Sequence, residues 1–570
     1  MILNSYDSGA EEVTACLIPN LMGTSRLPSD LPRPRLLGDG LAVAAAGCFV
    51  FLAAFRIELP GLYMDEVDFV NAAQGGTDNT MIKMRLGPVP ILLMPYLGAL
   101  KAWIWAPIFR VFGVSPLTIR LPAILIAALT LLIFYVAMRG ALGRLWAATV
   151  VWIMAVDSAN LFPSRLDWGP TVLMHFFQAA ILALWFSYRE KPQPWKPAFI
   201  FICFALGFFD KFNFIWLISS FVVGILICYP DGISGLWRSS ARFIRWLTVI
   251  LVLIASCTVL YLTLPLLLYF GTTVHTVGLQ AMGAMWASLL STLSGQAVAY
   301  FIFGDSNGIT PVASYWLIIT DFFLALACLF SPASSPQARE NRKHGFFCLL
   351  IAFFIFAQIA ITPQAGGPHH YSMIFPLPLL AFGFLTKSLY VQFATKSLQR
   401  LAVLVLGFAA ICLCVINVRN TAVYLSRFRW DSRYNPRWSP EIYSLSRYIN
   451  QHGFEAQAII SLDWGLHNQL HALASKKLRK RMRNPWRTFK TLTQKNEAEQ
   501  TAILHSFFPE GKVFTLTFAA SKETFPEARR NFLAVLASHP EVQSRLAKEF
   551  WSGDEKIYEL YEVTRNSDVR

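Results

Sequence analysis

The chain of 570 residues is 55% hydrophobic and only 15% charged, with a mean hydropathy of +0.46. These values exclude an ordinary soluble enzyme, and the apolar runs of about 17–25 residues have the length that crosses a bilayer as a helix. The formal net charge of +15 therefore does not indicate nucleic-acid binding, because Lys and Arg between spans fix orientation and meet anionic lipid. No cysteine pair has CxxC spacing, so neither a disulfide framework nor a cysteine metal site is predicted.

The N-terminal residues 1–38 are polar, and their basic residues lead directly into a first apolar run at 41–55. This run starts too late for a cleavable signal peptide. The basic cluster predicts a cytoplasmic N-terminal tail, so the next polar stretch, 59–88, is expected to be an extracytoplasmic loop.

Three carboxylates stand within four positions of this first outer loop, at Asp65, Glu66 and Asp68. A helix starting after Gly61 brings Asp65 and Asp68 together on one face. The opposite face carries Tyr63, Val67 and Val70. We expect this helix to lie on the bilayer surface, with its apolar side down and its carboxylates facing water or a cleft.

Further apolar segments predict about 11–13 spans in a transmembrane domain over residues 39–418. They lie at about 88–109, 118–138, 145–163, 171–188, 197–209, 213–229, 247–269, 314–330, 345–362, 371–386 and 400–418. Three segments fall between Asp65 and Asp167, where an even number of crossings is needed to keep the basic loops inside. Because Arg139 and Arg144 favour the cytoplasm, we expect segment 118–138 not to cross fully.

Two regions are predicted outside the membrane. Residues 270–313 form a long outer loop, apolar enough to hold helices along the surface, and residues 419–570 have the composition of a small α/β domain on the same extracytoplasmic side. Its expected helices lie near 440–452, 467–475 and 527–537, and its expected strands at 458–462, 512–518 and 557–563.

Ionisable groups beside these spans converge on the outer face, where charged groups at a membrane edge are costly unless they have a function. The acidic candidates are Asp65, Glu66, Asp68 and Asp167. The basic or polar candidates are Lys83, Arg85, Arg165, Lys211, His275, His369, His370 and Tyr371.

The order of these features resembles the GT-C glycosyltransferase superfamily, in the bacterial branch similar to protein O-mannosyltransferases and the lipid A aminoarabinose transferase. An acidic pair opens the first outer loop, and a basic residue before prolines follows about twenty residues later. The segments that carry the resemblance are Asp65-Glu66, Asn71-Ala-Ala, Lys83-Met-Arg85-Leu-Gly-Pro88-Val-Pro90, Phe112-Gly113, Arg120-Leu-Pro122, Ser164-Arg165-Leu-Asp167 and Gly207 to Lys211.

The resemblance implies a bacterial inner-membrane enzyme that moves a sugar from a polyprenyl-phosphate donor to a cell-envelope acceptor. Asp65 is then expected to be the general base. Glu66 and Asp167 would orient the acceptor or share a divalent cation, Mg²⁺ or Mn²⁺, which carboxylate oxygens suit. The expected donor-phosphate ligands are Lys83, Arg85, Lys211, His369 and His370.

Two other classes stay open from the sequence. A transporter or flippase for a lipid-linked or anionic substrate also needs ionisable groups, although its spans are expected to form a repeat, and none is evident. A sensor that binds its ligand through the outer α/β domain would give no reason for the paired carboxylates of the first loop.

Overall fold

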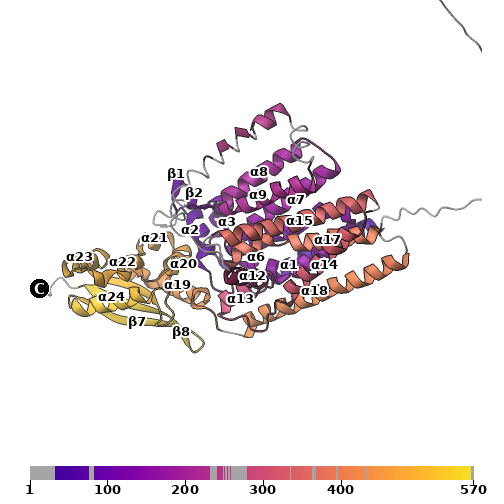
Figure 1. Ribbon diagram of the computed structural model, residues 1–570. Coiled ribbons are helices and arrows are strands. Elements are labelled where there is room, and N and C mark those ends of the chain that lie inside the picture. Colours follow the sequence, from indigo (N-terminus) through magenta and orange to yellow (C-terminus); the bar gives the residue numbers. More distant parts are fainter. Residues whose placement is uncertain are drawn as a thin grey trace, which may run out of the picture.

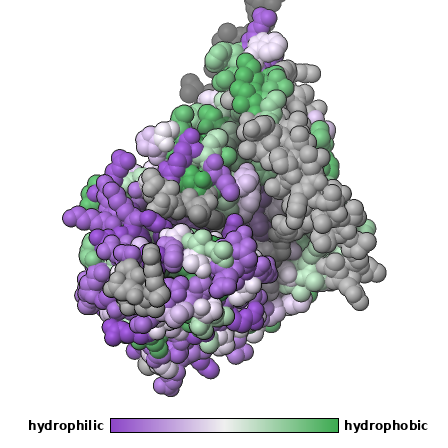
Figure 2. All heavy atoms as spheres, turned by 90° about the vertical axis from the view of Figure 1, so that its left-hand side faces the viewer, coloured by the Kyte–Doolittle hydropathy of each residue, from purple (hydrophilic) through white to green (hydrophobic). Residues whose placement is uncertain are grey.

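The computed structural model describes residues 33–75, 82–230 and 241–565, except for 248, 251–252, 255–256, 258–278, 334, 363–366, 393–395 and 431–432. Long helices form one body, and the C-terminal residues form a separate α/β domain at one end of it (Figure 1). In Figure 2, where this domain faces the viewer, its surface is mostly hydrophilic, while hydrophobic side chains gather on the helical part behind it. The predicted class, a polytopic helical membrane protein with a C-terminal α/β domain, is confirmed.

Seven helices in the described residues are long and apolar enough to cross a membrane, or up to nine if each of two bent pairs is one span. The helical part comprises α1 (Arg33–Ala54), α2 (Met64–Ala73), α3 (Leu100–Phe112), α4 (Pro116–Leu142), α5 (Arg144–Val156), α6 (Ser158–Leu166), α7 (Thr171–Glu190), α8 (Trp195–Asp210), η1 (Phe212–Phe214), α9 (Ile215–Cys228), α12 (Leu279–Leu293), α13 (Gln296–Phe303), α14 (Val312–Phe330), α15 (Pro336–Ile361), α16 (Pro368–Tyr371), η2 (Ser372–Ile374), α17 (Leu377–Gln392) and α18 (Lys396–Trp430). The predicted 11–13 spans also counted segment 247–269, most of which lies outside the described residues.

The segment predicted to span at 88–109 does not form one long helix. Strands β1 (Met84–Leu86), β2 (Val89–Met94) and β3 (Leu97–Gly98) make a small antiparallel sheet, and the 13-residue helix α3 follows. Prolines at 88, 90 and 95 explain the change, because proline lacks the backbone donor that a continuous helix requires.

The expectation that segment 118–138 would not cross fully is wrong. Helix α4 has the length and hydropathy of a complete span. Arg139 and Arg144, near the end of α4, both form ion pairs with Asp39 of α1. Their charges are therefore matched by a carboxylate of the first helix. Counted as one span, the bent pair α5–α6 would make two spans with α4 between Asp65 and Asp167.

The C-terminal domain contains a five-stranded sheet in the order β5-β4-β6-β8-β7. Its elements are η3 (Pro436–Trp438), α19 (Glu441–His452), η4 (Gly453–Glu455), β4 (Ala458–Ser461), α20 (Leu466–Leu473), α21 (Lys476–Arg479), β5 (Met482–Arg483), α22 (Trp486–Lys490), η5 (Leu492–Gln494), α23 (Glu497–Phe507), β6 (Gly511–Phe518), α24 (Pro526–Ser538), β7 (Val542–Ser552) and β8 (Glu555–Arg565). Strand β4 is parallel to β5 and β6, and β8 is antiparallel to β6 and β7.

All six elements predicted in this domain are present. Edge strand β7 was not predicted, because most of its residues are exposed and it lacks the apolar alternation that indicates a half-buried strand. The membrane-side helix α18 also continues to Trp430, past the predicted boundary at 418, so the folded domain starts near Pro436.

A close backbone contact joins the domain to the first outer loop. The Gly61 N–H donates to the Trp438 carbonyl at 2.7 Å, and the Tyr63 and Trp438 rings stack with centroids 4.3 Å apart. A β-carbon at Gly61 would lie 2.0 Å from the Ser439 carbonyl oxygen. Only glycine therefore permits this approach.

Candidate active site

Helix α2 confirms the helix predicted after Gly61. Glu66 accepts the Tyr63 backbone N–H at 3.1 Å and so satisfies a backbone donor at the start of the helix. The predicted position on the bilayer surface is wrong, because α2 packs between α3 and α20 of the C-terminal domain, and Asp68 is only 1% exposed. The carboxylates of the first loop consequently lie inside the protein.

Glu66 is held in a buried ion pair. Arg120 of α4 donates from Nε to Oε1 at 2.8 Å and from Nη2 to Oε2 at 2.9 Å. The same guanidinium donates to the carbonyls of Ile57, Pro60 and Gly61. Both Glu66 oxygens are thus occupied, which fits a residue that fixes α2 better than one that contacts the acceptor.

Asp167 is likewise paired with a buried cation. The Lys101 ammonium of α3 lies 2.6 Å from its Oδ2, and its Oδ1 accepts the Val172 backbone N–H at 2.8 Å at the start of α7. Asp167 therefore fixes the turn between α6 and α7.

Asp65 differs from these two carboxylates. It is half-buried, and the described residues give it one hydrogen bond, from the Trp168 indole N–H to Oδ2 at 3.1 Å. Burial raises its pKa to about 6, while the charge of nearby Lys211 and the Trp168 hydrogen bond partly oppose the rise. Asp65 is therefore an accessible carboxylate of raised basicity.

A cationic group lies next to Asp65. Lys211, between α8 and η1, is 3% exposed, and its ammonium donates to the Gly169 carbonyl at 2.5 Å. Burial lowers its pKa to about 8, against the opposing charges of the surrounding aspartates. A lysine ammonium has three N–H donors, so this bond leaves donor capacity for an anion.

The two candidate histidines, His369 and His370, lie on α16 close to Trp168 and Gly169. The His369 ring lies 5.8 Å from the Trp168 ring and 4.1 Å from the His370 ring, between centroids. Asn213 of η1 contacts Nδ1 of His370 at 3.1 Å. At Gly169, where φ is +66°, a β-carbon would lie within 2.6 Å of the His369 ring. The structure thus brings Lys211, His369 and His370 together around this glycine.

Lys83 and Arg85 lie apart from this cluster, on the hairpin side of α2. Exposed Lys83 lines a cavity of about 300 Å³ together with Met64 and Tyr96. Met64 precedes Asp65 in the chain, and the Tyr96 carbonyl accepts the backbone N–H of Phe212, the residue after Lys211. The other wall of the cavity comes from the C-terminal domain and includes Trp464, Asn468, Asn484 and Trp486. Asp65, Lys211 and His369 do not line this cavity, and neither does Arg85.

The remaining candidates have other surroundings. Arg165 donates from Nη2 to the carbonyls of Phe55, Arg56 and Leu59 and packs over the Phe428 ring, so it ties down the end of α1. Tyr371 is buried. His275 lies outside the described residues.

Asp68 bonds to Asn468 through Oδ1, while its Oδ2 is buried without a hydrogen-bond partner in the described residues. Burial, with the charge of Asp65, raises its pKa to about 8. At neutral pH its carboxyl is mainly protonated, so it is not a second base.

Glu66 and Asp167 do not fit the shared Mg²⁺ or Mn²⁺ site predicted for them. Each carboxylate is already matched by a buried protein cation, Arg120 or Lys101. Within the described ranges, no group of three or more His, Cys, Asp or Glu side chains is placed to hold a metal ion.

Three residues of the site were missed from the sequence: Lys101, Trp168 and Asn468. Lys101 carried a usable signal, since it is a lone charge inside the apolar segment 88–109. Asn468 had none, because it lies in a helix of the C-terminal domain far along the chain.

The chain is similar to known membrane glycosyltransferases in part of its sequence and in its fold. Residues 98–262 match the family described as dolichyl-phosphate-mannose-protein mannosyltransferase. ArnT from Cupriavidus metallidurans, solved bound to undecaprenyl phosphate, is 13% identical, with a TM-score of 0.56 over 91% of this chain and 97% of that one. The fold is that of the GT-C glycosyltransferases. The predicted GT-C resemblance is thereby confirmed.

The archaeal oligosaccharyltransferase AglB from Archaeoglobus fulgidus, in complex with an inhibitory peptide and a dolichol-phosphate, is 12% identical with a TM-score of 0.49, covering 85% of this chain and 70% of that chain. The conclusion on the GT-C fold rests on the ArnT comparison. No curated protein sequence matches the chain.

Proposed function

We propose that this GT-C protein is a membrane glycosyltransferase that transfers a sugar from a polyprenyl-phosphate donor to a cell-envelope acceptor, with Asp65 as general base. One observation supports this most directly. Of the three carboxylates Asp65, Glu66 and Asp167, only Asp65 has no ion pair with a cation in the described part of the chain, and the charge of the buried Lys211 ammonium acts on it.

In this mechanism the Asp65 carboxylate takes the proton of the acceptor hydroxyl as its oxygen attacks the anomeric carbon. The bond from that carbon to the donor phosphate breaks, and polyprenyl phosphate leaves. The proton on Asp65 passes to solvent before the next turnover. A base with a pKa near 6 is ionised at neutral pH and still takes up a proton readily.

The departing phosphate needs a fixed positive charge. Lys211 supplies it from a buried position, where a charge interacts more strongly than in water. The His369 and His370 rings adjoin Lys211 and provide further polar atoms. Lys83 lines a separate cavity that neither Lys211 nor His369 lines, so we do not assign it to this phosphate.

The cavity of about 300 Å³ is the proposed entry for the acceptor. It combines the Trp464 and Trp486 rings with the Asn468 and Asn484 amides, and such mixed apolar and polar linings are usual in ligand sites. We place this end of the molecule outside a bacterial inner membrane, as the basic loops predict. A cysteine at exposed Ser475, in a cysteine-free background, is expected to react with an impermeant thiol reagent in intact spheroplasts.

Purified protein supplied with a polyprenyl-phosphate sugar and an envelope extract tests the activity through transfer of labelled sugar. Asp65→Asn is expected to lower turnover by about 10²–10⁴-fold while donor binding is retained. Glu58→Gln, which removes an exposed carboxylate directly before the first outer loop, is the matched control. Equal activity in the two variants would show that Asp65 is not the base, and sugar movement without any transfer would favour a flippase.

A further inference from the structure

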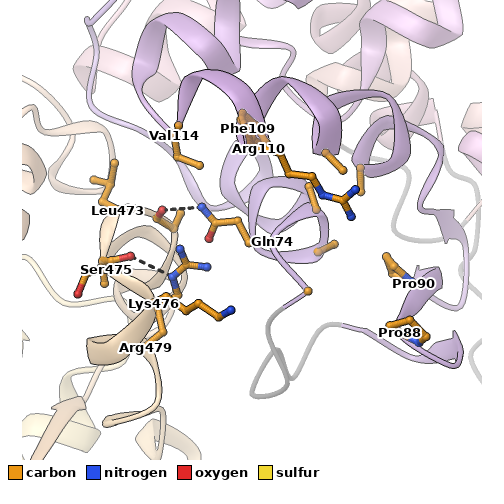
Figure 3. Close-up of a pocket in the computed structure, with 18 of the residues that line it drawn as sticks. Gln74, Pro88, Pro90, Phe109, Arg110, Val114, Leu473, Ser475, Lys476 and Arg479 are labelled. Carbon is orange, nitrogen blue, oxygen red and sulfur yellow. Dashed lines mark hydrogen bonds between the residues drawn. The ribbon is translucent and has the colours of Figure 1, made fainter.

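A second and larger cavity lies at the other end of α2. Its volume is about 720 Å³, within the usual range of ligand sites. One wall comes from α3 and the β1–β2 turn, and the other from the end of α20 and α21. Figure 3 shows Gln74, at the end of α2, between these walls.

The charged residues that line this cavity in the described part of the chain are all cationic. Arg110 lies on the α3 side, and Lys476 and Arg479 lie on the α21 side (Figure 3). None of the lining residues that the structure describes is acidic. Arg479 donates from Nε to the Ala474 carbonyl at 2.9 Å, which orients its guanidinium and leaves its terminal N–H groups available. The cavity is therefore complementary to an anion.

Its position is at the membrane boundary. Gly113 and Val114 line the cavity, and the long apolar helix α4 begins two residues later, at Pro116. Val111 and Phe112, at the end of α3, are 73% and 74% exposed. Near them the Trp103 indole donates to the Pro90 carbonyl at 2.7 Å, and tryptophan is typical of membrane–water interfaces.

We propose that this cavity binds the headgroup of an anionic bilayer phospholipid. The phosphate contacts Arg110, Lys476 and Arg479, and the acyl chains extend along the apolar end of α3. A soluble anion would not contact the exposed apolar side chains at the end of α3, Val111 and Phe112. The proposed donor phosphate is not the occupant, because neither Lys211 nor His369 lines this cavity.

The bound lipid would join two parts of the molecule. Arg110 belongs to the helical part, whereas Lys476 and Arg479 belong to the C-terminal domain, so one headgroup holds both. A ligand that binds only the docked arrangement stabilises it by mass action. Anionic lipid thereby keeps the C-terminal domain on α2.

The experiment uses the full-length protein, delipidated in a neutral detergent. Native mass spectrometry and thermal unfolding are followed with added phosphatidylglycerol, phosphatidylcholine or undecaprenyl phosphate. We expect phosphatidylglycerol to bind and to raise the unfolding temperature, and phosphatidylcholine to do neither. Arg110→Gln/Arg479→Gln should weaken phosphatidylglycerol binding by about tenfold or more, because charge-assisted contacts are lost.

Two further variants keep the test specific. Lys477→Gln/Lys480→Gln removes the same number of charges from exposed positions that do not line the cavity, and it should bind as the wild type does. Lys476→Gln, at an exposed lining position, should weaken binding without affecting folding. Unchanged binding in Arg110→Gln/Arg479→Gln, an equal loss in the control, or displacement by equimolar undecaprenyl phosphate would each overturn the proposal.

Discussion

Asn468 of the C-terminal domain donates a 2.5 Å hydrogen bond from Nδ2 to Oδ1 of Asp68, about one helical turn after Asp65 on α2. In return, the Asn71 side-chain amide donates to the Asn468 carbonyl at 3.0 Å. Both contacts are buried and link residues about 400 positions apart. The C-terminal domain therefore sets the orientation of the helix that carries the proposed base.

Asn468→Ala is expected to lower kcat by about tenfold to a hundredfold, because a small displacement of α2 misaligns Asp65. The KM for the donor should change little, since Asn468 does not adjoin Lys211. Asn496→Ala, which removes the N-cap of α23 in the same domain, costs about 1 kcal/mol of stability and is the control. Steady-state kinetics of both purified variants decide this, and equal kcat values would assign Asn468 a purely structural role.

The pH dependence of kcat/KM is expected to be bell-shaped. Asp65 acts as a carboxylate, and because burial raises its pKa to about 6, activity should fall as the pH drops through 6. Lys211 acts as a cation, and because burial lowers its pKa to about 8, activity should also fall as the pH rises through 8. Rates measured from pH 4.5 to 9.5 with saturating acceptor test both limbs.

Lys211→Arg separates the two groups. Arginine stays protonated across this range, so the alkaline limb should disappear while the acid limb stays near pH 6. An acid limb near the ordinary aspartate pKa of about 4 would contradict the role given to Asp65.

Glu66→Gln is expected to destabilise the protein by about 3 kcal/mol or more, since it leaves the buried Arg120 guanidinium without a counter-charge. Glu340→Gln breaks the half-exposed pair with Arg189 and should cost less than about 1 kcal/mol. Denaturant unfolding in detergent compares the two variants. A small effect of Glu66→Gln with complete loss of transfer would instead restore Glu66 as a residue that contacts the acceptor.

Gly61→Ala is expected to loosen the C-terminal domain, because its β-carbon would lie 2.0 Å from the Ser439 carbonyl. Overpacking of this kind usually costs about 1–3 kcal/mol. Gly40→Ala, where nothing lies within 4 Å of the added carbon, is the control. Limited proteolysis should release the domain from Gly61→Ala faster than from Gly40→Ala, and identical cleavage would refute the proposed contact.

The sequence by itself determined the membrane class, helix α2 with Asp65 near its start, and the six predicted elements of the C-terminal domain. These depend on local signals, namely apolar length, periodicity and the Pro-Gly before α2. Segment 88–109 shows the limit of hydropathy alone, since its length and apolar character favoured a span, whereas its prolines produced a small sheet and a short helix.

Only the tertiary structure decided which carboxylate is available. The sequence does not show which of Asp65, Glu66 and Asp167 has a protein cation as partner, and the structure pairs Glu66 with Arg120 and Asp167 with Lys101. Such pairs join distant segments, so no local pattern predicts them. The same holds for the position of α2. Its apolar face indicated the bilayer surface, but Val67 and Val70 pack into the core of the helical part, and Asn468 of the C-terminal domain binds its polar side. Burial among segments that are distant in the sequence is also what raises the pKa of Asp65, and no local pattern in the sequence encodes it.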